Sequence, residues 1–103
     1  GNNRGPLKAS DFQSVERDFA FVVDENMPAE NIVKAVNSVD KNLIGKISIF
    51  DVYKGAGMDE NKKSIAVNVK LQPNDKTMTD EEIDAFSTKV IDIVTKKTGG
   101  VLR

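Results

Sequence analysis

The sequence predicts an α+β fold in which two helices cover one face of a four-stranded antiparallel sheet. Extended and helical segments follow one another in the order strand, helix, strand, strand, helix, strand. A helix that joins two strands of one sheet crosses over with the same right-handed geometry in nearly all cases. Two such halves place both helices on the same face, and the expected strand order is 4-1-3-2.

The first half of the chain contains a strand, a helix and a second strand. Phe19 to Val23 is an apolar run between charged residues, which predicts a strand. Asn26-Met27-Pro28 ends it, and proline suits the first turn of a helix. A stripe with helical spacing follows, made of Ile32, Ala35, Val36 and Val39. The next strand is expected from Ile47 to Lys54, where β-branched and aromatic residues are frequent.

The second half contains the clearest strand and the better-marked helix. From Lys63 to Gln72, Ile65, Val67, Val69 and Leu71 alternate strictly with polar or small residues. Thr79-Asp80-Glu81-Glu82 is a capping box that starts a helix. Its apolar stripe comprises Ile83, Phe86, Val90, Ile93 and Val94. Gly99-Gly100 supplies a left-handed end, and Val101 to Arg103 is long enough for a short closing strand.

Alternation along the strands predicts one apolar face and one open face. The residues expected under the helices are Phe19, Phe21, Val23, Phe50, Val52, Ile65, Val67, Val69 and Leu71. Those expected on the opposite face are Ala20, Val22, Ile49, Asp51, Tyr53, Ser64, Ala66 and Asn68. A tyrosine among small residues leaves room for a flat group. An aromatic side chain on an open sheet is a common way to hold an unstacked nucleic-acid base.

Length and composition limit the possible functions. A chain of 103 residues forms one domain, and we expect residues 1–9 to be a flexible leader and residues 10–103 to be the folded unit. The chain has no cysteine and no histidine, which excludes disulfides, thiolate metal sites and a histidine base. No apolar run reaches membrane-spanning length and no signal peptide opens the chain. We therefore expect a soluble, cytoplasmic fragment of a larger protein, with no membrane partner.

Several segments, at consistent spacing, carry a resemblance to a known family: Arg17-Asp18-Phe19-Ala20, Phe50-Asp51-Val52-Tyr53-Lys54-Gly55, Lys62-Lys63-Ser64-Ile65-Ala66 and Thr77-Met78-Thr79-Asp80-Glu81-Glu82. Together they resemble the ferredoxin-fold anticodon-binding domain at the C-terminus of the β subunit of bacterial phenylalanyl-tRNA synthetase. The resemblance covers about Pro6 to Arg103. Gln13 departs from it, where proline is common, and so does Glu16, where a basic residue often precedes Arg17.

The resemblance implies a ferredoxin-like βαββαβ sandwich that binds unstacked anticodon bases of tRNA-Phe on the open sheet face during aminoacylation. The candidate RNA-binding residues are Tyr53, Asp51, Ser64, Asn68, Lys54, Lys63 and Arg17, with Lys62 and Lys70 as further cations. It implies no catalysis, cofactor or metal in this fragment, because ATP and magnesium act elsewhere in the parent ligase. The implied partners are tRNA-Phe, the rest of the β subunit and the α subunit, in an α2β2 heterotetramer.

Each candidate residue also has a simpler explanation. Tyr53 could be a surface residue that covers a cross-strand neighbour. Asp51 could pair with a nearby lysine, and the lysines could protect sheet edges from aggregation. Arg17 could hold the strand entrance from a buried position. The net charge of −1 also limits how much phosphate this domain can neutralise.

Two other functions are compatible with this topology. One is an ACT-like regulatory domain that pairs edge to edge and binds a small molecule, such as an amino acid, at the interface. It would need glycine in the first strand-to-helix turn, where Asp24 to Pro28 contains none. The other is a small phosphatase-type enzyme, which would need a phosphate cradle at the same turn. The acidic residues there argue against it.

Overall fold

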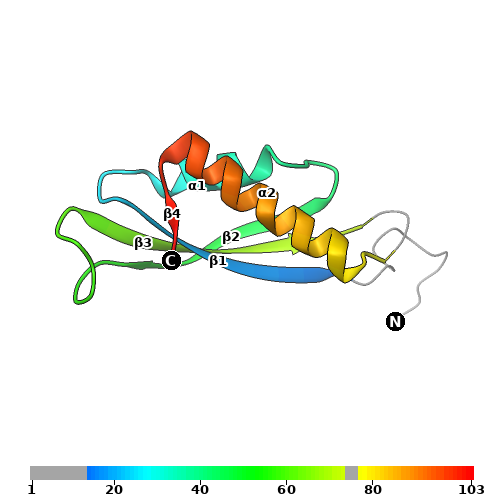
Figure 1. The fold of residues 1–103 in the computed structure, drawn as a ribbon, viewed down its shortest axis with the longest axis horizontal. Helices are drawn as coiled ribbons and strands as arrows, with labels where there is room; N and C mark the ends of the chain where they lie inside the picture. The colour runs from blue at the N-terminus through cyan, green and yellow to red at the C-terminus, as the bar shows by residue number, and fades with distance from the viewer. Residues whose placement is uncertain (1–13, 74–76) are drawn as a thin grey trace.

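A four-stranded sheet with two helices on one face forms the domain (Figure 1). The structure, a computed structural model, describes residues 14–73 and 77–103. Its elements are β1 (Val15–Asp24), α1 (Ala29–Asn37), β2 (Ile44–Tyr53), β3 (Lys62–Leu71), α2 (Asp80–Thr98) and β4 (Val101–Leu102). The order β2-β3-β1-β4, with every neighbouring pair antiparallel, is the predicted order 4-1-3-2 counted from the other edge. The predicted ferredoxin-like fold is confirmed.

Two strands extend further than their apolar residues suggest. β1 begins at Val15, not at Phe19, and it pairs with β3 from Val15 opposite Leu71 to Asp24 opposite Lys62. β2 likewise begins at Ile44, not at Ile47. The first residues of both strands are polar or include glycine, and backbone hydrogen bonds to β3 keep them in the sheet. A pattern of apolar residues cannot predict such backbone pairing.

Local signals place both ends of α2. Thr79 is the N-cap: its Oγ1 accepts a hydrogen bond from the Glu82 amide at 3.1 Å, and its own amide donates to Glu82 Oε1 at 2.8 Å. Gly99 ends the helix with a left-handed φ of 76°, and its amide donates to the Thr95 carbonyl. The predicted capping box and glycine stop are confirmed.

The core lies between the sheet and the helices. It comprises Phe19, Phe21 and Val23 of β1, Ile65, Val67, Val69 and Leu71 of β3, Ile32, Ala35 and Val36 of α1, and Phe86, Val90 and Val94 of α2. The residues predicted to face the helices from β1 and β3 are therefore correctly placed.

The predicted faces of β2 are wrong for Ile49 and Phe50, because this edge strand contains a bulge, whereas Asp51 and Tyr53 lie on the open face as predicted. Ile49 pairs with Val67, whereas Asp51 pairs with Ala66, the next residue of β3, so Phe50 is an extra residue. Ile49, expected on the open face, packs against the core. Phe50 and Val52, expected in the core, are 56% and 52% exposed. Val52 lies opposite the buried Ile65, but at the outer edge of the sheet about half of its side chain stays accessible.

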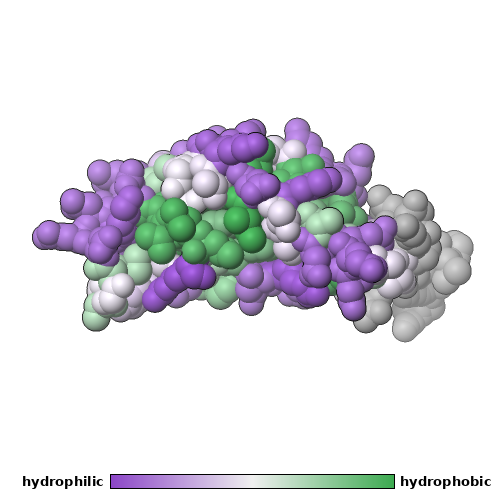
Figure 2. Space-filling model, viewed as in Figure 1, coloured by the Kyte–Doolittle hydropathy of each residue, from purple (hydrophilic) through white to green (hydrophobic). Residues whose placement is uncertain are grey.

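β4 is too short to cover β1 completely. It pairs only with Phe21 and Val22. Figure 2 shows apolar surface below α2 near this strand, and both of its residues, Val101 and Leu102, are exposed. In the described residues no helix is long and apolar enough to cross a membrane.

Candidate nucleic-acid interface

The strand register shows which side chains share the face opposite the helices. On β3, Ser64, Ala66 and Asn68 alternate with buried core residues. Each has one neighbour on β1 and one on β2, which gives three rows across the sheet: Val22, Ser64 and Tyr53; Ala20, Ala66 and Asp51; Asp18, Asn68 and Ser48. We call these nine residues the open face. It brings together the predicted Tyr53, Asp51, Ser64 and Asn68.

Tyr53 is held firmly at the end of β2. Its backbone pairs with Ser64, and its hydroxyl donates a 2.8 Å hydrogen bond to the Ala56 carbonyl in the following loop. Gly55 follows with a φ of +154°, which residues with a side chain rarely adopt, and a Cβ at this position would be in ordinary contact with the tyrosine oxygen, at 3.4 Å. The tyrosine is 37% exposed. Its ring is therefore a fixed, partly accessible surface.

Arg103, which was not among the predicted site residues, contacts this ring. Its guanidinium carbon lies 5.5 Å from the centroid of the Tyr53 ring, within cation–π range. Its backbone amide donates to the Ala20 carbonyl at 2.8 Å. Ser64 is only 4% exposed although it belongs to the open face. Strand register could have predicted this contact. If a fourth strand pairs with β1, Arg103 lies opposite Ala20, and the small alanine side chain lets the arginine extend across the sheet toward β2.

Asp51 lies next to Ala66 and is exposed. No ion pair of the described residues includes this carboxylate, so the predicted alternative of a lysine partner is not observed. Its oxygens are placed to accept hydrogen bonds from a group lying on the small residues of the open face.

Lys54 and Lys62 are engaged near the β2–β3 hairpin. Lys54 Nζ lies 3.1 Å from Glu25 Oε1 and donates to the Lys62 carbonyl. Lys62 Nζ lies 2.7 Å from Asp24 Oδ1. Both pairs are partly exposed, and such pairs contribute about 0–1 kcal/mol, so either lysine can exchange its carboxylate for a phosphate at small cost.

Lys63 and Arg17 do not lie on the open face. Lys63 pairs with Val23 and Arg17 with Val69, and both partners belong to the core side of the sheet. Arg17 is exposed and its Nη1 donates to the Glu16 carbonyl, so the alternative of a buried arginine at the strand entrance is wrong. Lys70, in contrast, follows the alternation of the open face, between Glu16 and Lys46.

Two carboxylates lie around Asn68, at the end of the open face away from Tyr53. Asn68 Nδ2 donates to Asp18 Oδ1 at 2.7 Å and to Glu16 Oε1 at 3.2 Å. Glu16, one of the departures from the family pattern, thus binds a side chain of the face. The other departure, Gln13, and the leader proposed at residues 1–9 lie outside the described residues. Lys70 and Lys46 form the next pair along these strands, so both signs of charge occur at this end of the sheet.

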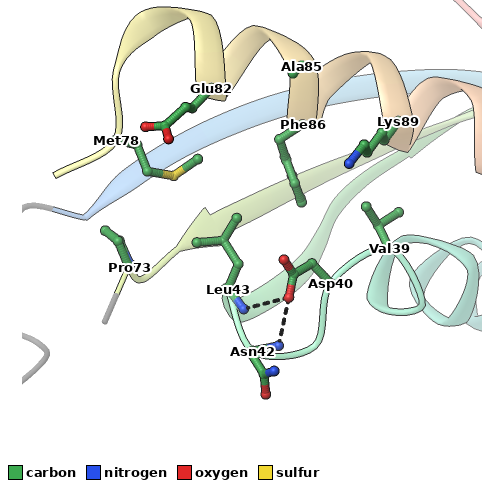
Figure 3. A pocket seen from close by; sticks show the side chains of 10 residues that line it. All are labelled: Val39, Asp40, Asn42, Leu43, Pro73, Met78, Glu82, Ala85, Phe86 and Lys89. Carbon is green, nitrogen blue, oxygen red and sulfur yellow. Dashed lines mark hydrogen bonds between the residues drawn. The ribbon is translucent and has the colours of Figure 1, made fainter. Parts of the chain in front are cut away.

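A groove of about 560 Å³ lies on the other side of the molecule, between α2 and the α1–β2 turn (Figure 3). Val39, Leu43 and Phe86 provide much of its apolar wall. Its acidic groups bind local backbone: Asp40 Oδ1 accepts from the amides of Asn42 and Leu43, and Glu82 accepts from the Thr79 amide. Residues 14–73 and 77–103 contain no cluster of three or more potential metal ligands.

The β1–α1 turn gives no support to a small-molecule site. The Glu25 amide donates to the Asn61 carbonyl, and the Met27 amide closes a turn on the Asp24 carbonyl. No glycine occurs between Asp24 and Pro28, so the side chains of the turn limit the approach of a ligand to its backbone.

Comparison with known proteins identifies the family. The family model of the ferredoxin-fold anticodon binding domain matches residues 10–103. Similar proteins include the phenylalanine–tRNA ligase β subunits of Rhodopseudomonas palustris (56% identical), Bradyrhizobium diazoefficiens (55%) and Brucella abortus (55%). Each match spans 97 residues, which are 94% of this chain and 12% of the relative. The chain belongs to the ferredoxin-fold anticodon binding domain family.

Proposed function

We propose that this domain binds the anticodon of tRNA-Phe as part of the β subunit of a phenylalanyl-tRNA synthetase. The observation that carries the proposal is the open face itself, where Tyr53 stands beside Ser64 and Ala66 in a chain of the anticodon-binding family. Charging would occur elsewhere in a cytoplasmic α2β2 enzyme, with ATP and magnesium bound there. The rest of the β subunit and the α subunit would be the protein partners.

The open face offers the contacts that an unstacked base requires. The ring of Tyr53 provides a stacking surface, and stacking on an aromatic side chain is worth about 1–3 kcal/mol per base. Ala20 and Ala66 form a flat floor beside it. The carboxylate of Asp51 can accept a hydrogen bond from an amino or imino group on the edge of the base. Stacking would supply affinity, and the edge contact would supply selectivity.

The charge of the domain fits a secondary contact better than an independent RNA-binding site. Its net charge is −1, and carboxylates occupy one end of the open face. Affinity for RNA comes largely from neutralised phosphates, which this surface supplies sparingly. If other parts of the synthetase hold the tRNA body, the anticodon contact becomes intramolecular and weak intrinsic affinity is enough.

An NMR titration of the ¹⁵N-labelled chain tests the proposal. The ligands are an anticodon stem-loop with the phenylalanine anticodon and a stem-loop with the same stem and an unrelated loop. We expect the first to shift the amide signals of Asp51, Tyr53, Ser64 and Ala66 at lower concentrations than the second. Equal shifts with both loops, or shifts confined to α1 and α2, would contradict anticodon binding on the open face.

A further inference from the structure

We propose that Arg103 and Tyr53 are the two sides of a clamp for one unstacked base, and that the clamp is closed on itself in the free domain. The inference rests on the proposed function, because it names how the open face would hold a base. It adds a residue from β4's end to a site otherwise built from β1, β2 and β3.

The contact in the free domain occupies the surface that a base would need. The guanidinium carbon of Arg103 lies over the Tyr53 ring, 5.5 Å from its centroid. A planar, delocalised guanidinium stacks on aromatic faces much as a base does. The same ring face cannot hold both groups in direct contact. A base that stacks on Tyr53 must therefore move the guanidinium, which can then cover the outer face of the base.

The two sides of the clamp differ in how firmly they are held. Tyr53 is fixed by its strand pairing and by the hydrogen bond from its hydroxyl to Ala56. Arg103 is fixed only through its backbone amide, which donates to Ala20. Among the described residues its guanidinium has no hydrogen bond or ion pair besides the ring contact. The tyrosine is thus a stationary side and the arginine a movable one.

The floor between them suits a flat ligand. Ala20 and Ala66 lie in the row level with Arg103, and Ser64 lies in the row of Tyr53. Ser64 is 4% exposed, whereas Ala20 and Ala66 are half-buried, so part of this floor is accessible beside the ring. Ser64 places a hydroxyl-bearing side chain in this floor, next to Tyr53. Asp51, at the end of the Ala66 row, faces this floor with a hydrogen-bond acceptor. This combination of plane, cation and acceptor fits a nucleobase in a single-stranded loop.

The test compares base stacking with simple charge attraction. Wild-type chain, Arg103→Ala, Arg103→Lys and Tyr53→Ala are titrated with the anticodon stem-loop and with loops carrying one abasic nucleotide in the anticodon. Lys41→Ala, which removes an exposed cation in the α1–β2 turn, is the matched control. Titrations at two salt concentrations give the salt slope. The spectra of the free variants show whether each retains the fold.

We expect Arg103→Ala and Arg103→Lys to weaken binding by about five- to tenfold each, because lysine keeps the charge but lacks the plane. One abasic loop should bind wild type and both Arg103 variants equally, since the clamped base is missing. The salt slope of Arg103→Ala should match that of wild type, whereas loss of a phosphate contact would lower it by about one. In the free chain, the side-chain proton signals of Arg103 should lose their ring-current shift in Tyr53→Ala.

Three results would overturn the clamp. Wild-type affinity of Arg103→Lys would show that only charge matters, and tighter binding by Arg103→Ala would show that the arginine merely obstructs the ring. Unchanged Arg103 proton shifts in Tyr53→Ala would show that the free clamp is not closed. Each can occur while the wild-type chain still prefers the anticodon loop, in which case the proposed function stands. Equal binding of anticodon and unrelated loops by wild type would instead overturn the proposed function.

Discussion

Burial differs sharply between paired residues of neighbouring strands, and stability should follow it. Ile65 is fully buried and Phe86 nearly so, whereas Val52, opposite Ile65, is half exposed. We expect Ile65→Ala and Phe86→Ala each to lower the free energy of unfolding by about 2–5 kcal/mol, because both leave cavities in the core. Val52→Ala should cost less than either.

Lys54→Ala is the surface control for these variants. It removes a partly exposed pair with Glu25 and should change the free energy of unfolding by less than about 1 kcal/mol. Urea unfolding followed by circular dichroism measures all four variants. Equal midpoints for Ile65→Ala, Phe86→Ala and Lys54→Ala would contradict the assignment of the faces.

The sequence predicted the positions of some site residues correctly and missed others. Tyr53, Asp51 and Ser64 lie together on the open face as expected, although the bulge at Phe50 places Ile49 on the core side of the sheet. The alternation from Asp51 to Tyr53 matches the prediction, and the shift of register lies before it, between Ile49 and Asp51. The sequence of the strand does not signal this shift. Arg103 was missed because a contact across the sheet depends on which strand lies at its edge.

Among the helices and strands, α2 has the ends that depend most clearly on nearby residues. Its capping box and its left-handed Gly99 are set by side chains and backbone within a few residues, so the sequence predicts both ends. The beginnings of β1 and β2 depend instead on pairing with β3, which joins residues far apart in the chain. The beginnings of β1 and β2 were therefore predicted less well than the two ends of α2.

Removing either terminal signal of α2 should destabilise the domain. Thr79→Ala removes the cap that accepts from the Glu82 amide, which should cost about 1 kcal/mol. Gly99→Ala forces a side chain into a φ of 76°, at a cost of about 1–2 kcal/mol. Thermal unfolding measures both, with Thr79→Ser as a control that keeps the hydroxyl. If Thr79→Ser loses as much stability as Thr79→Ala, the cap is not the cause.

The whole domain has a small open face and a net charge of −1, and the chain matches 12% of the length of its relatives. The isolated chain should show no aminoacylation and no ATP hydrolysis. It should bind tRNA weakly, with affinity that falls as the salt concentration rises, because phosphate contacts add to the stacking contact. Filter binding across salt concentrations and a phenylalanine-activation assay check this. Phenylalanine activation by the purified chain would overturn it.

The central claim is that a base stacks on Tyr53 when the synthetase charges tRNA. The most direct measurement is kcat/KM for tRNA-Phe in the full synthetase carrying Tyr53→Ala. We predict a decrease of about one to two powers of ten, a much smaller decrease for Tyr53→Phe, which keeps the ring, and unchanged phenylalanine and ATP kinetics in the activation step. Wild-type charging kinetics in the Tyr53→Ala enzyme at every salt concentration would show that Tyr53 is only a surface residue.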